Sequence, residues 1–342
     1  MSLRFLKKRQ RRQPFWFWVL VLSFVFLVLF LFSGRLRDVF LPEKEIKISE
    51  DLVFVKLWDV ESTQLLEIGL EAYVLGVVAA EMPASFPLEA LKAQAVAART
   101  YAVKRLQVPD PRVKTFHQAA QLSSDPAVNQ AWISTSEMKK RWGKWNYATH
   151  RKKIKQAVEE TQGEVLLYKG QLIDPVYHAS CGGKQTENSA EVWKFALPYL
   201  KGVSCTGHQD RHHSTPLFFT WENCDDLLGT KLAALPVSKL QKEQVVFQIK
   251  EKSFTGRVKA VMIGGKAFSG VELRTQLNLP STRFACQLGN EGLHIISNGY
   301  GHGVGMCQYG AADFAAKGKN YQEILQHYYS GVQMGSLQKE DN

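Results

Sequence analysis

The sequence predicts an α+β protein, in which an N-terminal transmembrane helix precedes a mixed α+β ectodomain with an active-site groove. Three observations support this fold class: a long apolar run near the N-terminus, helical and strand patterns in mixed order, and no internal repeat. Of the 342 residues, 45% are hydrophobic and 22% are charged. These proportions exclude a disordered or collagen-like chain and are sufficient for a sizeable core.

The apolar run covers residues 15–32 and contains no charged residue, while six Lys and Arg side chains lie in residues 1–14. A run of this length is sufficient for a ~30 Å hydrocarbon core, and basic flanks stay in the cytoplasm. We therefore expect a cytoplasmic basic tail (1–14), a transmembrane helix (15–32) and a stalk (33–50) before an extracytoplasmic ectodomain. A cleavable signal peptide is the alternative, although its apolar region usually has only ~7 to 15 residues.

The net charge is +11, from 43 Lys and Arg against 32 Asp and Glu. An excess of this size indicates an acidic partner, such as nucleic acid, anionic lipid or an anionic wall polymer. Much of the excess lies in the basic tail, so the rest of the chain is only modestly basic. Because the folded part faces outward, we expect a wall polymer and no nucleic acid.

The folded part is expected to begin with a strand over 52–57, where Val, Phe and Leu give a high β-propensity. An apolar helix over 69–81 ends before Pro83, because the residue that precedes a proline is pushed out of the helical region. A second helix follows. It has Pro87 in its first turn and apolar residues at steps of three and four as far as residue 105.

Residues 107–160 are expected to form a loop-rich insertion followed by a basic helical stretch, 139–155. A hairpin, three short strands and two C-terminal helices complete the chain. They cover residues 163–173, 245–250, 257–263, 293–297, 311–317 and 321–329. The ectodomain should therefore span 51–335, with 206–285 as a candidate inserted β-rich subdomain and 336–342 as a C-terminal tail.

Glu81 is the unusual residue of the first of three segments that carry chemistry, which runs from Tyr73 to Tyr101 and begins with YVLGVVAAEMP. It ends an apolar helix, where the negative end of the helix dipole and the apolar neighbours both favour the protonated acid. A carboxyl group that stays protonated near neutral pH can act as a general acid. A buried ion pair with Lys92 or Arg99 is an equally good interpretation of the charges alone.

The second segment, YHASCGGKQTEN (177–188), gathers hydroxyl groups, an imidazole and an ammonium group around two glycines. A loop that binds a polar substrate has this character, although a polar turn after a strand is the simpler interpretation. The third segment, GYGHGVGMCQYGA (299–311), lacks the Lys-Ser/Thr ending of a phosphate-binding loop. We interpret its glycines as letting the backbone approach an extended ligand, with His302 and Gln308 pointing into the groove.

The cysteines are too few and too scattered for a disulfide-dense scaffold. They are Cys181, Cys205, Cys224, Cys286 and Cys307. In an oxidising compartment a bridge between Cys181 and Cys205 is allowed. Free or buried thiols are an equally good interpretation, and both alternatives stay open.

Together the three segments resemble the SpoIID/LytB family of sporulation and amidase-enhancer proteins. The resemblance rests on residues 70–102, 177–188 and 299–312, in that order, and extends over about residues 50–335. It implies a peptidoglycan lytic transglycosylase without a cofactor, anchored in the cell membrane on the mother-cell side of the sporulation septum. The implied partners are glycan strands, a companion amidase (stage II sporulation protein P) and other engulfment membrane proteins.

The resemblance also implies the site residues. The catalytic glutamate of the family falls on Glu81. Its expected substrate-binding neighbours are Lys92, Arg99, Tyr177, His178, Ser180, Lys184, His302 and Gln308. With a single carboxyl group, Glu81 would protonate the oxygen between N-acetylmuramic acid and N-acetylglucosamine, and a 1,6-anhydro end would form. The alternatives are a non-catalytic wall-binding activator of a partner amidase and a membrane-anchored sporulation scaffold.

Two positions depart from the family pattern. Cys307 stands where serine is usual, and the zinc site of clostridial members lacks three of its four ligands here. That site would fall on His117, Ser123, Val128 and Asn129. We therefore expect no metal there and no effect of chelation on stability or glycan cleavage. The other candidate metal ligands, for which a polar surface loop is the simpler interpretation, are Cys205, His208, His212 and His213.

Overall fold

The structure is a computed structural model that describes residues 44–48, 54–193, 195–205, 207–208, 212 and 215–339. These residues belong to one structural unit, which begins at Lys44. The expected basic tail (1–14) and transmembrane helix (15–32) lie outside the described residues. Among the residues that are described, no helix is both long enough and apolar enough to cross a membrane.

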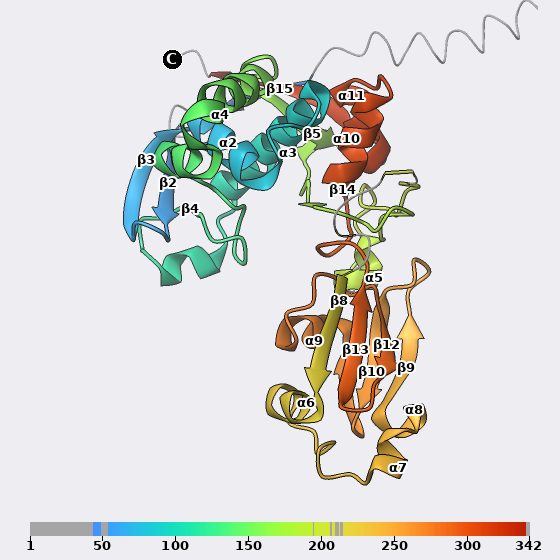
Figure 1. Ribbon diagram of the computed structural model, residues 1–342. Helices are drawn as coiled ribbons and strands as arrows, with labels where there is room; N and C mark the ends of the chain where they lie inside the picture. Colours follow the sequence, from blue (N-terminus) through green and yellow to red (C-terminus); the bar gives the residue numbers. More distant parts are fainter. Residues whose placement is uncertain are drawn as a thin grey trace, which may run out of the picture. The chain divides into compact units, whose positions relative to one another are not determined.

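Helices packed around α3 form the first hydrophobic core. The helices are α2 (Leu70–Glu81), α3 (Leu88–Gln107), α4 (Thr135–Glu159), α10 (Gln308–Ala316) and α11 (Tyr321–Tyr328). α3 contacts each of the other four (Figure 1). Its alanines at positions 90, 93, 95, 97, 98 and 102 are fully buried, so neighbouring helices approach it closely on several sides. The helices expected over 69–81 and as far as residue 105 are confirmed as α2 and α3.

A four-stranded sheet in the same region joins the two ends of the described chain. Its strands, in spatial order, are β1 (Lys44–Ile48), β15 (Gln333–Lys339), β5 (Glu164–Tyr168) and β6 (Gln171–Leu172). β1 pairs in parallel with β15. Residues 44–48, within the expected stalk (33–50), therefore form a paired strand, and 336–339, within the expected tail (336–342), belong to β15. A ladder of backbone hydrogen bonds holds them, and polar sequences supply those bonds as well as apolar ones.

Two smaller sheets bring the segments of the site together. In one of them, β2 (Phe54–Asp59) pairs with β3 (Gln64–Gly69) and with β4 (Leu122–Ser123). In the other, β7 (Tyr177–His178) pairs in parallel with β14 (Met306–Cys307). Shorter helical segments in the connections are η2 (Pro111–Thr115) and α5 (Ser189–Trp193). The pairing of β7 with β14 places the second chemical segment directly beside the third.

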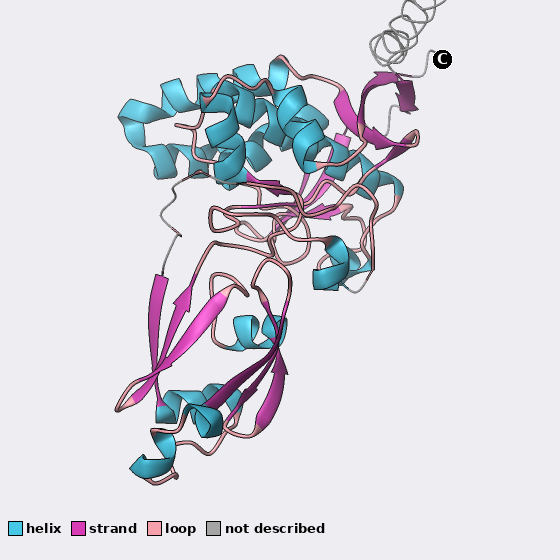
Figure 2. Cartoon of the chain, turned by 90° about the vertical axis from the view of Figure 1, so that its right-hand side faces the viewer, coloured by secondary structure: helices cyan, strands magenta, loops and turns pink. Residues whose placement is uncertain are grey.

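A second hydrophobic core extends from Trp221 to Ile295. It contains two antiparallel three-stranded sheets, in the orders β12-β13-β8 and β11-β10-β9 (Figure 2). The strands are β8 (Thr215–Thr220), β9 (Phe247–Lys252), β10 (Val258–Ile263), β11 (Lys266–Ser269), β12 (Phe284–Leu288) and β13 (Gly292–Ser297). The helices are α6 (Trp221–Leu228), α7 (Val237–Leu240), α8 (Glu243–Val246) and α9 (Gly270–Gln276). The β-rich segment expected over 206–285 extends to residue 297, because β13 pairs with β8.

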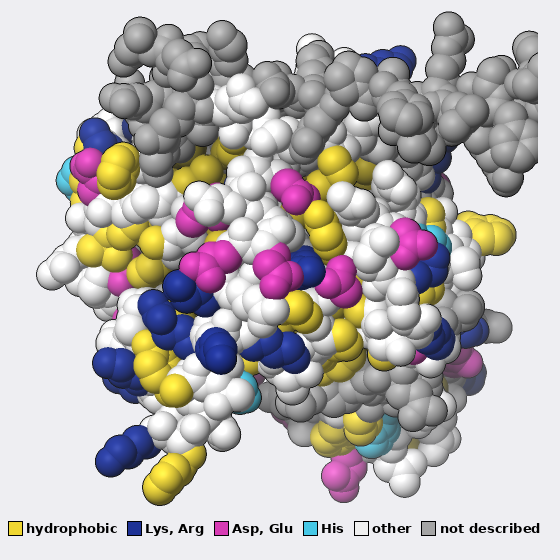
Figure 3. Space-filling view, turned by 90° about the horizontal axis from the view of Figure 1, so that it is seen from above, with side chains coloured by type: hydrophobic (Ala, Val, Ile, Leu, Met, Phe, Trp, Pro, Cys, Tyr) yellow, Lys and Arg dark blue, Asp and Glu magenta, His cyan; other side chains and the backbone are white. Residues whose placement is uncertain are grey.

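α4 carries several exposed basic residues along its length. They are Lys139, Lys140, Arg141, Lys144, Lys152 and Lys155. Seen from above, Lys and Arg side chains gather on one side of the molecule beside a row of carboxylates (Figure 3). The basic stretch expected over 139–155 is thus helical on both sides of Gly143, where the backbone leaves the helical region (φ 67°, ψ 172°).

Arg99 is a fully buried cation of the first core. Its Nε and Nη2 atoms donate to the two carboxylate oxygens of Glu71 at 2.8 and 2.6 Å. Nη1 donates to the carbonyl oxygen of Glu164 at 3.1 Å, and Nη2 donates to that of Val158 at 3.3 Å. The planar guanidinium group therefore ties α3 to α2, α4 and β5 at once.

Arg99→Lys is expected to lower the free energy of unfolding by about 2–4 kcal/mol, because one ammonium group leaves part of the carboxylate and the carbonyl oxygens unpaired. The midpoint of urea unfolding, followed by circular dichroism, measures this loss. Arg112→Lys is the matched control, since Arg112 pairs with Asp110 at the surface and such a pair contributes less than about 1 kcal/mol. Equal shifts in the two variants would contradict the structural role of Arg99.

Candidate active site

Glu81 is the last residue of α2, at the point where the helix stops. Met82 has extended backbone angles (φ −117°, ψ 142°), and a proline follows it. Nη1 of Arg141 donates to the carbonyl oxygens of Ala79 and Ala80 at 2.8 and 3.0 Å. These bonds satisfy orphan acceptors of the helix end and hold a positive charge near the carboxyl group.

Two donors reach the carboxyl group of Glu81. The N–H of Ala131 donates to Oε1 at 3.1 Å, and Nε2 of Gln308 donates to Oε2 at 3.4 Å. Burial nevertheless raises the pKa of Glu81 to about 7, against the opposing effects of these hydrogen bonds and of Arg141. At neutral pH a large fraction of the group is therefore protonated, which agrees with the expectation from its apolar neighbours.

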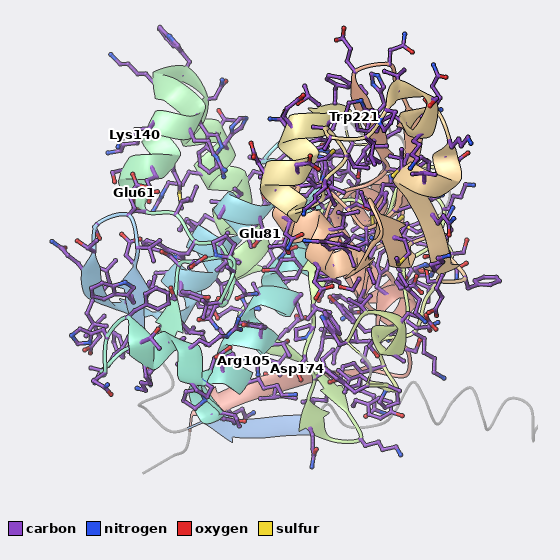
Figure 4. All side chains as sticks on the ribbon, turned by 90° about the horizontal axis from the view of Figure 1, so that it is seen from below. Glu61, Glu81, Arg105, Lys140, Asp174 and Trp221 are labelled. Carbon is purple, nitrogen blue, oxygen red and sulfur yellow. The ribbon has the colours of Figure 1, made fainter. Side chains whose placement is uncertain are left out.

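A pocket of about 370 Å³ opens beside Glu81 and brings the three chemical segments together with the loop before α4. Its lining residues are Glu81, Tyr101, Pro126, Asn129, Gln130, Pro175, Val176, Tyr177, His178, Ala179, Tyr300, Gly301, His302 and Gln308. Glu81 is the only Asp or Glu among these described lining residues. Figure 4 labels it in the interior, whereas Lys140 and Glu61 lie at the periphery.

Gln308 connects the carboxyl group of Glu81 to helix α3. Its Nε2 atom also donates to Oε1 of Gln94 at 3.2 Å, and both glutamine side chains are buried. One amide nitrogen carries two N–H donors, so it can serve both acceptors. Gln308 is the first residue of α10 and directly follows β14. Its position beside Glu81 therefore depends on the pairing of β14 with β7.

The glycines of the third segment allow it to pack closely on the second segment. Gly301 and Gly305 have positive φ angles of 101° and 70°. A Cβ atom at Gly305 would lie 2.0 Å from the carbonyl oxygen of Val176, and one at Gly301 would lie 2.8 Å from Cβ of His178. These glycines therefore pack closely on Val176 and on His178 of the second segment. Gly301 also lines the pocket, and the approach of an extended ligand stays a prediction.

Hydrogen bonds fix the ring of Tyr177 in the pocket wall. Its hydroxyl oxygen accepts from Nε2 of Gln130 at 2.8 Å, and the Gln130 carbonyl oxygen accepts from the Tyr73 hydroxyl at 3.3 Å. Burial, followed by the charge of Glu81, holds the pKa of Tyr177 well above its ordinary value. The phenol is therefore neutral and can donate a hydrogen bond.

His302 and His178 are held by backbone groups. Nδ1 of His302 accepts from the Val304 N–H at 3.1 Å, so Nε2 carries the proton and donates to the Tyr177 carbonyl oxygen at 2.9 Å. Burial, with His178 as the next cause, lowers the pKa of His302 to about 3. Burial also lowers the pKa of His178. Both imidazoles are therefore neutral, and His302 is a positioning residue rather than a proton donor.

Lys92 and Arg99 do not face this pocket, in contrast to their expected roles. Lys92 forms ion pairs with Glu89 at 2.8 Å and Glu160 at 2.6 Å, and Arg99 is enclosed by the core contacts described above. The side of α3 that reaches the pocket carries Gln94 instead. Neither cation contacts the Glu81 carboxyl group, so the alternative of a buried ion pair with Glu81 is wrong.

Ser180 and Lys184 of the second segment also lie outside the pocket. Ser180 is fully buried, and its Oγ atom accepts from the Gly182 N–H at 3.0 Å. Lys184 lines a separate pocket of about 410 Å³, together with Arg283 and Phe254. Only the first part of the second segment, around Tyr177 and His178, therefore borders Glu81.

A cluster of ion pairs holds Asp174, the residue before the pocket-lining Pro175 and Val176, in place. Lys104 and Arg105, at the end of α3, bind the two oxygens of Asp174 at 2.6 and 2.8 Å. Arg105 and Asp174 point toward one another in Figure 4. Asp174 directly precedes the lining residues Pro175 and Val176, so the cluster sets where this wall begins.

Sequence reasoning missed Gln94, Gln130 and the Ala131 N–H. Gln94 is an uncharged polar residue between alanines in α3 and is fully buried, as are Arg99 and Thr100. Gln130 and Ala131 lie in an irregular loop, where no periodicity indicates which side chain turns inward.

The position of the clostridial zinc site holds other contacts. His117 stacks on Trp58, with ring centroids 5.6 Å apart. The carbonyl oxygen of the Asn129 side chain accepts from the Ser123 N–H at 2.9 Å. His117, Ser123 and Asn129 are therefore engaged in packing and loop hydrogen bonds.

The second candidate metal set differs from the expectation of a polar surface loop. Cys205 and His208 are buried and lie together with Cys181 and Cys307 rather than with His212. His213 lies outside the described residues. All five cysteines are free, so the free-thiol alternative, rather than the Cys181–Cys205 bridge, is the one present.

Comparisons with known proteins agree with the geometry. The SpoIID family model, described as Stage II sporulation protein, matches residues 59–168, which include Glu81 and helices α2 and α3. Stage II sporulation protein D of Bacillus subtilis (strain 168) is 37% identical over 284 residues, which cover 82% of this chain and 79% of the relative. The protein of the same name from Bacillus amyloliquefaciens is 36% identical over 289 residues, covering 84% and 80%.

A third relative, the Amidase enhancer of Bacillus subtilis (strain 168), is 30% identical over 308 residues, which cover 76% of this chain and 40% of the relative. Since more than a third of the residues are identical over more than four fifths of the chain, the chain belongs to the SpoIID family.

Proposed function

We propose that this chain is a peptidoglycan lytic transglycosylase, with Glu81 as its single general acid and base. One observation carries the proposal: a buried carboxyl group with a pKa of about 7 lies in a pocket whose described lining has no second carboxyl group. Glycosidases that add water normally need two carboxyl groups. Attack by a hydroxyl group of the substrate itself needs no positioned water, so one carboxyl group is sufficient.

In the first step the protonated Glu81 carboxyl group donates its proton to the oxygen between N-acetylmuramic acid and N-acetylglucosamine. The bond from this oxygen to C1 of the muramoyl residue breaks, and the N-acetylglucosamine hydroxyl leaves. The carboxylate that forms is stabilised by the Ala131 N–H, Gln308 and Arg141, which all favour the charged form. These groups are in place before the proton moves, so little reorganisation is needed.

In the second step the Glu81 carboxylate accepts the proton of the muramoyl 6-hydroxyl group. Its oxygen then forms a bond to C1 and leaves a 1,6-anhydromuramoyl end. The carboxyl group of Glu81 therefore acts first as the acid and then as the base, and it returns to its protonated form. The neutral Tyr177 hydroxyl group and the exposed Tyr300 ring, both in the pocket lining, offer hydrogen-bonding and apolar contact to the sugars.

The second candidate function is a wall-binding module that activates a partner amidase. The specific observation in its favour is the 30% identity to a relative named Amidase enhancer. A binding module does not need a carboxyl group whose pKa is raised to about 7 by burial, since a protonated buried acid costs stability at higher pH. We therefore place catalysis first and binding second.

We also propose that the chain works in sporulation, as the names of its relatives indicate, and that residues 15–32 anchor it in the cell membrane. The apolar run and its basic flank support the anchor. Protease added outside protoplasts should digest residues 33–342 and leave the basic tail protected. Release of the intact chain by a high-salt wash would contradict an anchor in the bilayer.

Glu81→Gln is expected to keep the fold and lose at least ~100-fold in rate, because the amide has the same shape but cannot deliver a proton. Purified glycan strands are incubated with the protein, and anhydromuramoyl products are counted by mass spectrometry. Binding of the same strands in a pull-down should remain.

Glu61→Gln is the matched control, because Glu61 is exposed in the turn between β2 and β3 (Figure 4). It should cleave strands at the wild-type rate. A Glu81→Gln variant within a few-fold of the wild type would overturn the assignment of Glu81. If the wild type binds strands and forms no anhydro ends, the amidase-activating function is favoured instead.

The rate of cleavage is expected to fall about tenfold per pH unit above pH 7, since the acid is active only when it is protonated. The relevant pKa of Glu81 is about 7. Initial rates measured between pH 5 and pH 9 show whether the cleavage rate falls in this way. A flat profile up to pH 9 would show that Glu81 is not the proton donor.

The Gln308→Leu variant provides a second test of the fall in cleavage rate above pH 7. The Gln308 hydrogen bond lowers the pKa of Glu81, so its loss should raise that pKa and move the fall in cleavage rate to higher pH. Gln130→Leu is the control, because Gln130 lies in the same pocket and bonds Tyr177 rather than Glu81. If the cleavage rate of the Gln308→Leu variant falls over the same pH range as that of the wild type, Gln308 does not influence the pKa of Glu81.

A further inference from the structure

Four buried side chains meet behind the pocket wall, away from Glu81. They are Cys181, Cys205, His208 and Cys307, with exposed fractions of 0%, 1%, 7% and 0%. Their three sulfur atoms and one imidazole nitrogen all lie within 4.8 Å of one another. The set comes from three separate parts of the chain: the second segment, the connection after α5, and the third segment.

The measured distances agree with those around a tetrahedral zinc ion. Zinc–sulfur bonds of ~2.3 Å and zinc–nitrogen bonds of ~2.0 Å place neighbouring ligand atoms about 3.5 to 3.8 Å apart. Sγ of Cys181 lies 3.3 Å from Nε2 of His208, and Sγ of Cys307 lies 3.5 Å from the same nitrogen. One imidazole nitrogen thus faces two sulfur atoms, as a shared ion requires.

Two backbone N–H groups point at the sulfur atom of Cys307. The sulfur accepts from the Cys181 N–H at 3.3 Å and from the Gly310 N–H at 3.4 Å. Sγ of Cys205 lies 3.0 Å from the Tyr328 hydroxyl oxygen. Donors of this kind hold metal-bound thiolates in place and offset their negative charge. Arg283 adds a cation nearby, since Nη1 donates to the Cys181 carbonyl oxygen at 3.3 Å.

We propose that Cys181, Cys205, His208 and Cys307 bind one structural Zn²⁺ ion. Three thiolates and one imidazole are a ligand set that zinc prefers, and four protein ligands leave no open position for substrate. On binding, the ion replaces the thiol protons, which pass to solvent. This site is separate from residues 117–129, and it reverses the expectation that the chain binds no metal.

The position of the ion explains what it would stabilise. Cys307 directly precedes Gln308, which bonds Glu81, and Cys181 follows the pocket-lining residues Tyr177 and His178. The β7–β14 ladder that joins these segments has only two residue pairs, Tyr177 with Met306 and His178 with Cys307. A metal bridge would hold this short ladder in register far more firmly than its backbone bonds.

The test measures zinc in the untagged full-length chain, purified without chelator from zinc-supplemented medium. About one zinc per chain is expected to survive dialysis. Cys181→Ser, Cys205→Ser and Cys307→Ser should each reduce the retained zinc to below about a fifth. Cys224→Ser and Cys286→Ser are the matched controls, since both cysteines are buried in the second core, and they should keep the full amount.

Cobalt provides a readout that does not depend on the variants. Co²⁺ added to the metal-free wild type should give the intense visible absorption of a tetrahedral thiolate site, and zinc should remove it. Wild-type chain with less than about a fifth of an equivalent of zinc would overturn the proposal. So would a disulfide between two of the proposed ligands, identified by mass spectrometry of unreduced peptides, or equal zinc loss in the control variants.

Discussion

The contact between the second and third chemical segments is the constraint on which the site depends. These segments are more than a hundred residues apart in the sequence, and their parallel strands β7 and β14 share only two residue pairs. Glycines with positive φ let the backbones approach to a distance that a side chain would prevent. Gln308 reaches Glu81 only because of this approach, and the three cysteines and His208 converge for the same reason.

The helices and Glu81 were predictable because their signals are local. Apolar residues at steps of three and four predicted α3, and the proline after Met82 predicted the end of α2, each to within two residues. The burial of Glu81 at the end of α2 followed from its apolar neighbours. Arg99 shows the limit of this reasoning. The sequence correctly placed Arg99 on helix α3. Because other elements pack around α3, the sequence could not show that the side of α3 with Arg99 faces Glu71 rather than the pocket.

Features that depend on distant partners were not predictable from the sequence. β1 is a strand because β15 supplies its backbone partners, and β15 lies between β1 and β5 in the sheet. Gln130 and Ala131 enter the site from a loop without periodicity. His208 was weighed with its near neighbours His212 and His213, whereas its actual partners Cys181 and Cys307 lie far away along the chain. In each case the tertiary fold, not the local pattern, decides the contact.

The parallel pairing of β1 with β15 has a mechanical consequence. A pull along the strand on the chain that precedes Lys44 would load all the β1–β15 hydrogen bonds in shear, so they would resist together rather than open one by one. β15 is in turn bonded to β5 on its other edge, and the load would pass into the sheet. Arg99 bonds both the Glu164 carbonyl oxygen of β5 and the Glu71 carboxylate of α2, so part of this load would reach the helix that ends at Glu81.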